Sequence, residues 1–129
     1  MIPSDLARQD FCYLSTTGRV TGRTHTIEIW FAAEGDTLYL LSGGGDRADW
    51  VRNAIADPSV RVRVGDTVWA GRAEVVRDPV HRSRPAGLVH DKYAPTYSGS
   101  LTGWRDSALL VAVTVGGPIE DGDARDGGR

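Results

Sequence analysis

The sequence predicts a mainly β fold with short helices (α+β), built as one antiparallel β-barrel. Short segments in which apolar and polar side chains alternate recur along the chain, and turn residues separate them. Only two stretches have helical character, which is too few for a parallel sheet, because each parallel connection needs a crossover. A barrel fits better, since closing the sheet removes exposed strand edges. The 129 residues are enough to bury one core, so we expect a single domain.

We expect six antiparallel strands. The clearest is 59–64, where three valines alternate with two arginines. The turn sequences Glu34-Gly35-Asp36 and Gly65-Asp66 indicate a hairpin at each of these positions. The six expected strands are residues 11–17, 24–33, 37–42, 59–64, 67–77 and 107–115.

The first helix is expected over residues 47–56. Asp46 precedes it and is a favoured N-cap residue, and Trp50 lies on its apolar stripe. We expect the helix to end at Asp57, because a residue before proline, here Pro58, avoids the helical conformation.

A second helical segment is expected after Asp78, with Pro79 in its first turn. Pro85 lies inside this segment, and we expect it to break the helix into two short pieces that end near Tyr93. Residues 94–106 contain proline and glycines and are expected to form a loop.

Composition argues against several classes of protein. The net charge of −2 gives no general attraction to nucleic acid, and the single cysteine allows no disulfide framework. The apolar runs are too short to cross a bilayer, so we expect a cytoplasmic protein without a transmembrane segment, while peripheral membrane contact stays open. We expect the barrel domain to span residues 1–116 and residues 117–129 to form a disordered tail.

A glycine-rich turn follows the third expected strand. Gly43, Gly44 and Gly45 precede Asp46 and the first helix, where main-chain N–H groups can approach a phosphate. The alternative interpretation is a flexible turn between a strand and a helix.

A second motif carries two arginines. Arg19 follows Gly18, Arg23 follows Gly22, and His25 lies just beyond. A loop hinged by glycines can wrap an anionic group, and arginine suits phosphate or carboxylate. The alternative is a solvated hairpin tip.

Aromatic residues and histidines complete the candidate site residues. Tyr93, Tyr97 and Trp104 cluster in a region rich in proline and glycine, where they could bind a flat ligand or could close the end of the barrel. His81 and His90 are too far apart in the sequence for a helical metal site, and we expect no bound metal.

The order and spacing of these motifs resemble one known family. Residues 14–23 read Leu-Ser-Thr-Thr-Gly-Arg-Val-Thr-Gly-Arg, and residues 41–45 read Leu-Ser-Gly-Gly-Gly. Trp50-x-x-Asn53 and Asp57-Pro58-x-Val60 follow. This pattern, over residues 11–115, resembles the deazaflavin-dependent nitroreductase family. Its members are oxidoreductases that use coenzyme F-420, an 8-hydroxy-5-deazaflavin. They adopt a split β-barrel of the flavin-reductase/pyridoxamine-phosphate-oxidase type.

The resemblance implies roles for individual residues. The residues that would hold the phosphate and acidic tail of the cofactor are Gly18, Arg19, Gly22, Arg23 and His25. The turn that would place amides beside ring and phosphate comprises Ser42, Gly43, Gly44 and Gly45, while Trp50 and Asn53 would line the deazaflavin. Tyr93 and Tyr97 would be the catalytic residues at the acceptor, with Tyr93 the better match. Many members have lysines where this chain has Val20 and Gly43, which weakens the electrostatic attraction for the cofactor.

The expected activity is hydride transfer from the reduced deazaflavin to a small-molecule acceptor that is quinone-like, nitroaromatic or an enone. This chemistry requires neither a nucleophile nor a metal. Two alternatives remain from the sequence: a non-catalytic split barrel that binds an apolar ligand or cofactor, and a relative that binds flavin mononucleotide or haem. The sequence leaves open whether the protein is a monomer or a homodimer.

Overall fold

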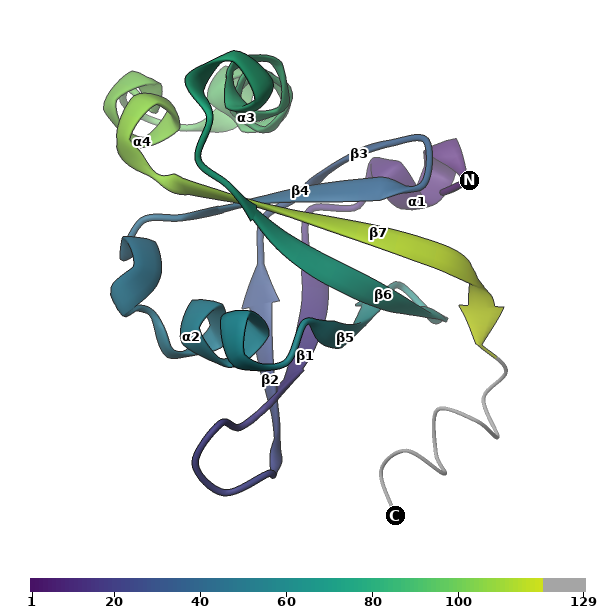
Figure 1. Cartoon of the computed structure of the whole chain (residues 1–129). Coiled ribbons are helices and arrows are strands. Elements are labelled where there is room, and N and C mark those ends of the chain that lie inside the picture. The colour runs from purple at the N-terminus through teal and green to yellow at the C-terminus, as the bar shows by residue number, and fades with distance from the viewer. Residues whose placement is uncertain (120–129) are drawn as a thin grey trace.

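One antiparallel sheet of seven strands dominates the computed structural model, which describes residues 1–119 (Figure 1). The order of neighbouring strands is β2-β1-β5-β6-β7-β4-β3. The strands are β1 Cys12–Thr17, β2 Thr24–Ile29, β3 Ala32–Glu34, β4 Thr37–Ser42, β5 Ser59–Val64, β6 Thr67–Val76 and β7 Leu109–Ile119.

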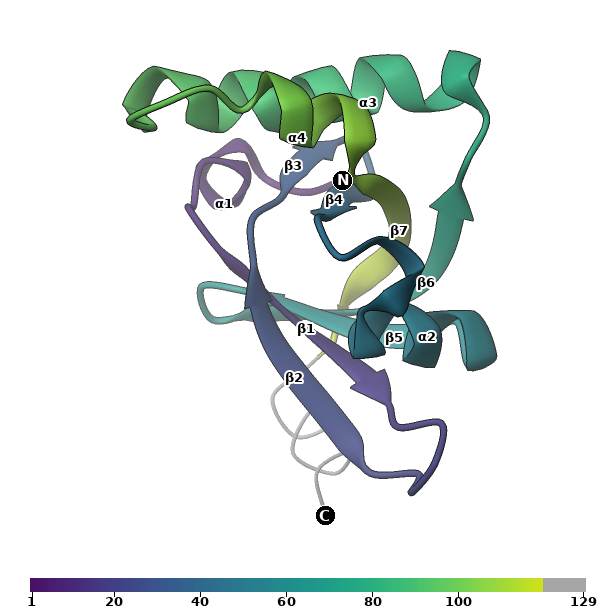
Figure 2. The same ribbon diagram turned by 90° about the vertical axis from the view of Figure 1, so that its left-hand side faces the viewer.

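The two outer strands of this sheet are neighbours in the sequence. Only Trp30 and Phe31 separate β2 from β3, so the sheet curls until its ends approach each other (Figure 2). The expected strand 24–33 is therefore two strands, of which the first pairs with β1 and the second with β4. This division explains why the sheet has seven strands where the sequence predicts six.

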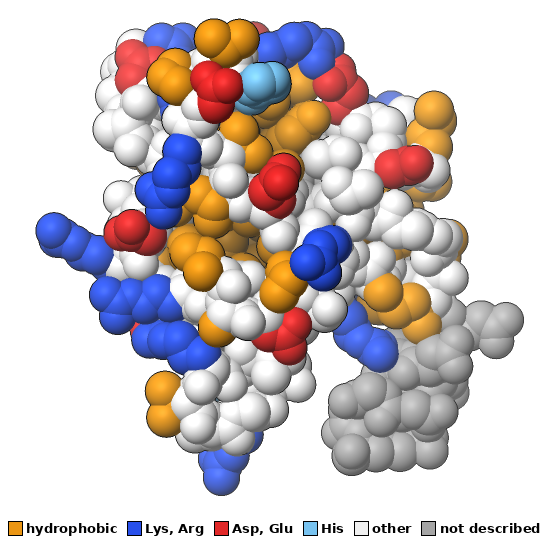
Figure 3. Space-filling model, in the orientation of Figure 1, with side chains coloured by type: hydrophobic (Ala, Val, Ile, Leu, Met, Phe, Trp, Pro, Cys, Tyr) orange, Lys and Arg blue, Asp and Glu red, His pale blue; other side chains and the backbone are white. Residues whose placement is uncertain are grey.

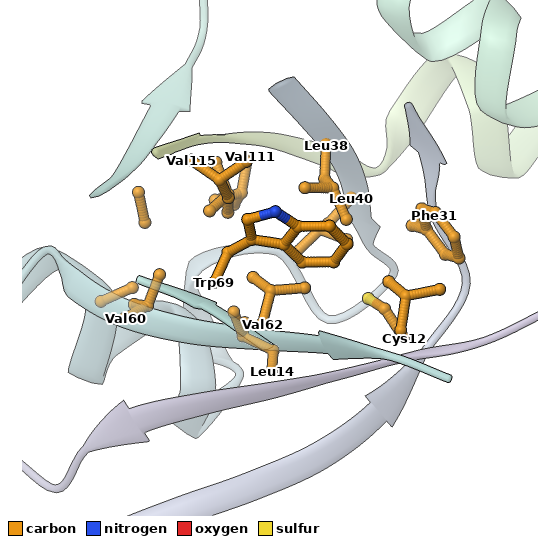
Figure 4. Packing of buried hydrophobic residues seen from close by; sticks show 14 of the residues in the cluster. Cys12, Leu14, Phe31, Leu38, Leu40, Val60, Val62, Trp69, Val111 and Val115 are labelled. Carbon is orange, nitrogen blue, oxygen red and sulfur yellow. The ribbon is translucent and has the colours of Figure 1, made fainter. Parts of the chain in front are cut away.

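The inside of the curled sheet carries the main hydrophobic core. Trp69 of β6 is 1% exposed, and its indole lies between Leu40 of β4 and Val62 of β5 (Figure 4). The three valines of β5 are all buried, as their alternation predicts. The hairpins β3–β4 and β5–β6 also confirm the turns expected from the sequence.

The first expected helix is confirmed but begins differently. A 3-10 turn, η1 Gly45–Arg47, precedes α2 Asp49–Ala56. The N-cap of α2 is Ala48, without a side-chain hydrogen bond, so the prediction of Asp46 as the cap is wrong. The reason is that Asp46 lies within η1, where its carboxylate pairs with Arg77 at 3.5 Å.

The second helix, α3 Pro79–Tyr93, is continuous through Pro85, so the predicted break is wrong. Its N-terminus is as expected, because the Asp78 carboxylate accepts a hydrogen bond from Val80 N at 3.0 Å. Tertiary packing preserves the helix despite its proline, since one face is buried against the sheet.

The segment expected as a loop, 94–106, contains two helical turns, η2 Ala94–Thr96 and α4 Thr102–Ser107. A second apolar cluster joins α3 and this segment to the other face of β4 and β7, and it includes Val89, Leu101 and Leu110. Burial of that cluster is what orders a segment rich in glycine and proline. A short helix, α1 Ser4–Ala7, lies near the N-terminus.

β7 continues beyond the expected end of the domain. Trp69 pairs with Pro118 and Val68 with Ile119, so residues 117–119 belong to the sheet rather than to a tail. The rest of the predicted tail, 120–129, lies outside the described residues. Among residues 1–119, no helix has the length and apolar character needed to span a membrane.

Candidate functional site

The loop between β1 and β2 is closed by its own main chain. Gly18 N donates to Arg23 O at 2.7 Å, and Gly22 N donates to Gly18 O at 2.8 Å. Gly22 has φ of 75°, a conformation that glycine adopts without strain. Gly18 is required for another reason, because a Cβ atom there would lie 2.7 Å from Nε2 of His25. The loop therefore has a defined shape, with His25 packed against its first residue.

Arg19 joins this loop to α2. Asn53 Oδ1 accepts hydrogen bonds from Arg19 N at 3.2 Å and from Arg19 Nη1 at 2.8 Å. Asp49 Oδ1 accepts from Arg19 Nη2 at 3.2 Å. Asn53 is 3% exposed, and its Nδ2 donates to Thr16 Oγ1 at 3.4 Å. A buried amide thus fixes the direction of the Arg19 guanidinium.

A cavity of about 430 Å³ lies between this loop, β2 and α2. Ile27 and Trp50 give it an apolar wall, while Arg19 and His25 give it basic groups. Five residues predicted to bind the cofactor line this cavity: Gly18, Arg19, His25, Trp50 and Asn53. Gly22 and Arg23 lie in the same loop but do not line the cavity.

The turn after β4 is a separate feature. Ser42 is 3% exposed, and its Oγ donates to Gly45 O at 3.0 Å, which closes the turn. Gly43 and Gly44 are exposed. These residues do not line the cavity described above; Gly45 lines a second hollow, of about 370 Å³. Figure 3 shows Lys and Arg side chains gathered over η1 and α2, where Arg47 and Arg52 are exposed.

An aromatic cluster lies beside this turn, centred on a residue that the sequence analysis did not single out. The ring of Trp30 stacks on Tyr93 at 4.1 Å and 6°, and it meets Tyr97 at 6.0 Å and 86°. Trp104 contacts Trp30 at 5.8 Å and 89°. A Cβ atom on Gly43 would lie 3.7 Å from the Trp104 indole, so the glycine turn and the cluster are adjacent.

The hydroxyl of Tyr93, a predicted catalytic residue, is engaged by the main chain. Its side chain is buried, and its hydroxyl accepts from Phe31 N at 3.0 Å. The same hydroxyl is within donating distance of Asp10 O at 2.8 Å and Phe31 O at 3.0 Å. Burial raises the pKa of Tyr93 well above its usual range. These contacts join the end of α3 to Phe31 and to the segment before β1.

Lys92 also joins the end of α3 to the N-terminal segment and to Phe31. Its Nζ donates to Gln9 O at 2.6 Å and to Phe31 O at 2.9 Å, and it lies 3.7 Å from the centre of the Phe31 ring. Burial lowers the pKa of Lys92 to about 8. The C-terminal end of α3 therefore holds both the N-terminal segment and the junction between β2 and β3.

Tyr97 is the more accessible of the two predicted catalytic tyrosines. It is 46% exposed, and its ring meets Trp30 edge-on. Within residues 1–119, its hydroxyl has no hydrogen-bond partner. A phenol in this position is available to a ligand placed against the aromatic cluster.

The curled antiparallel sheet defines the fold class, which is a split β-barrel of the pyridoxamine-phosphate-oxidase type. Similar solved structures include HutZ, the heme storage protein of Vibrio cholerae, with TM-score 0.73, 14% identity and coverage of 90% of this chain and 89% of that one. Rv2991 of Mycobacterium tuberculosis has TM-score 0.70 and 20% identity, and the match covers 92% of this chain and 82% of that one. An F420-H2-dependent reductase, FDR-A, has TM-score 0.65 and 21% identity, and the match covers 81% of this chain and 93% of that one. At such identities the likeness shows the fold.

The family follows from the sequence match. Residues 2–119 match the model of the F420H(2)-dependent quinone reductase family, and the chain belongs to this family. A comparison with curated proteins gives no match. The protein is therefore a deazaflavin-dependent oxidoreductase whose cofactor is coenzyme F420, as the order of its motifs predicts.

The residues present fit such a cofactor. A deazaflavin has a flat, largely apolar ring and an anionic phosphate and tail, and the cavity offers both kinds of surface. Trp50 and Ile27 can pack against a ring, while Arg19 and His25 can face an anion. The absence of a side chain at Gly18 lets the His25 ring lie close to the main chain of the loop.

Proposed function

We propose that this protein holds coenzyme F420 in the cavity beside the Gly18–Arg23 loop and reduces a quinone-like acceptor at the aromatic cluster. The observation that carries the proposal is the convergence of Gly18, Arg19, His25, Trp50 and Asn53 on one cavity. The reduced cofactor supplies the hydride when it is bound. The chain itself must bind the cofactor, orient the acceptor and exclude water.

Binding would divide between two kinds of group. Arg19, supported by the exposed Arg23 at the loop tip, would attract the phosphate and acidic tail. Trp50 would pack against the ring. The exposed amides of Gly43 and Gly44 would add hydrogen-bond donors at the turn after β4. Asn53 would act as a positioning residue, because its amide is buried and bound to Arg19.

The acceptor would lie against Trp30 and Trp104, next to Gly43. Flat aromatic surfaces favour a planar molecule such as a quinone and displace water from it. Tyr97 would donate a hydrogen bond, or a proton, to the acceptor oxygen that gains negative charge. Nitroaromatic and enone acceptors present an oxygen in a similar plane and are the alternatives to be tested.

Steady-state oxidation of reduced F420 by a soluble naphthoquinone, a nitroaromatic compound and a cyclic enone tests this proposal. We expect the quinone to give the highest kcat/KM, and Tyr97→Phe to lower kcat by about tenfold, as for loss of one hydrogen bond made in the transition state. Tyr13→Phe, on the outer face of the sheet, is the matched control. Absence of turnover with every acceptor would favour a non-catalytic binding protein. Light scattering of the same samples distinguishes a monomer from a homodimer.

A further inference from the structure

We propose that Asp49 lowers the affinity of the cavity for the anionic part of its ligand, because the Asp49 carboxylate occupies one nitrogen of the Arg19 guanidinium. The inference rests on the proposed function and deepens it. Asp49 lines the cavity together with Arg19, so the contact lies where the phosphate or acidic tail is expected to bind.

The two partners of Arg19 differ in how firmly they are held. Asn53 is 3% exposed, and it binds both the main-chain N and Nη1 of Arg19. The side chain of Asp49 is 83% exposed, and it binds only Nη2, at 3.2 Å. An exposed ion pair is weak and is easily exchanged for another anion, whereas the buried amide has no such freedom. Asn53 therefore keeps Arg19 in place while Nη2 exchanges its partner.

Charge gives Asp49 a second effect on the same ligand. Its carboxylate cancels part of the positive potential of Arg19, and it repels a phosphate or carboxylate that approaches the cavity. A ligand that replaces Asp49 exchanges one ion pair for another, so it gains only the difference between them. A ligand without an anionic group leaves the Arg19–Asp49 pair intact, and its binding does not depend on Asp49.

A fluorescence titration of the full chain with oxidised F420 tests the inference. We expect Asp49→Asn to tighten the Kd by about two- to fivefold at low salt, and this gain to shrink as salt screens the charges. Asp49→Glu keeps the charge and should show no such tightening. Asp66→Asn removes the same charge from the exposed β5–β6 turn and is the matched control. Thermal denaturation confirms that each variant is folded.

Two further arms identify the cause. The 8-hydroxy-5-deazariboflavin, which lacks the phosphate and tail, should bind equally to the unmodified protein and to Asp49→Asn. In an Arg19→Gln background, the gain from Asp49→Asn should largely disappear, because the two residues act through one contact. An equal gain in both backgrounds would show a general charge effect and would overturn the inference.

Failure of the inference is distinguishable from failure of the proposed function. If F420 binds and Arg19→Gln weakens it, but Asp49→Asn leaves the Kd unchanged or weakens it, the role of Asp49 is wrong and the cavity remains the cofactor site. If the unmodified protein binds no F420, or Arg19→Gln binds it normally, the proposed site is wrong and the inference falls with it.

Discussion

Replacing Tyr93 with phenylalanine separates structural from catalytic roles at the end of α3. The change removes one hydroxyl and keeps the ring that stacks on Trp30 at 4.1 Å. The hydroxyl accepts from Phe31 N and donates toward Asp10 O or Phe31 O. Because Phe31 is 0% exposed, its N–H would be left without a partner and shielded from water.

A buried, unpaired donor costs about 1–3 kcal/mol, so we expect Tyr93→Phe to lower the free energy of unfolding by about 2 kcal/mol. For a domain of this size that corresponds to a fall of about 6–10 °C in Tm. Turnover per folded molecule should stay within about twofold of the unmodified protein. Urea denaturation gives the free energy, with Tyr13→Phe as a control that loses an exposed hydroxyl and its hydrogen bond to Glu28 and leaves no buried group without a partner. Unchanged stability together with a large fall in kcat would refute this prediction and would indicate that Tyr93 is a catalytic residue.

Three further predictions concern the loop, the pH dependence and the core. Gly18→Ala would place a methyl group 2.7 Å from the His25 ring, so His25 must move. F420 binding, measured by fluorescence, should weaken by about tenfold, as for loss of one charged contact. Unchanged binding would contradict this prediction. Burial lowers the pKa of Lys92 from 10.5 to about 8, so the unfolded chain binds more protons above pH 8 and this group makes the free energy of unfolding rise with pH. Lys92→Met should lose that rise in urea denaturation between about pH 7 and 9. Burial raises the pKa of Cys12 from 9.0 to about 12, which has the opposite effect from about pH 9 upward, but both proteins keep Cys12, so the difference between their slopes reports Lys92; equal slopes contradict the assignment. Trp69→Ala should cost about 3–5 kcal/mol by the same measurement, because the indole is 1% exposed, and a loss below about 1 kcal/mol would show that the core repacks.

Local patterns in the sequence predicted the elements whose causes are local. The alternation in β5 and the turn at Gly65 determine a hairpin from neighbouring residues alone. The Asp78 cap is likewise a contact between residues two positions apart. The continuity of α3 through Pro85 could not be predicted this way, because it depends on packing against strands distant in the sequence.

The candidate site was predictable in part, because some of its features are local sequence motifs and others are contacts between distant residues. The motif order identified the loop around Gly18 and the helix that carries Asn53, and the structure brings them to one cavity. The sequence could not show that Asn53 binds Arg19, or that Tyr93 is tied to Phe31 across 62 positions. The one local signal for Trp30 was the run Ile29-Trp30-Phe31, which interrupts the alternation of the expected strand at the point where it changes partners.

Titration of the full chain with oxidised F420 and, in parallel, with flavin mononucleotide, each at low and high salt, tests the proposed cofactor site most directly. We expect F420 to bind more tightly by at least about tenfold, with an affinity that falls as salt rises, because the proposed site would hold its phosphate and tail with arginines. Arg23→Ala should weaken F420 binding and leave Tm nearly unchanged, because Arg23 is exposed. Arg19→Ala should weaken F420 binding and also lower Tm, because the buried Asn53 loses the hydrogen bond from Arg19 Nη1. Equal affinities for the two cofactors, or an affinity for F420 that is insensitive to salt and to both arginine variants, would contradict the assignment of the cavity.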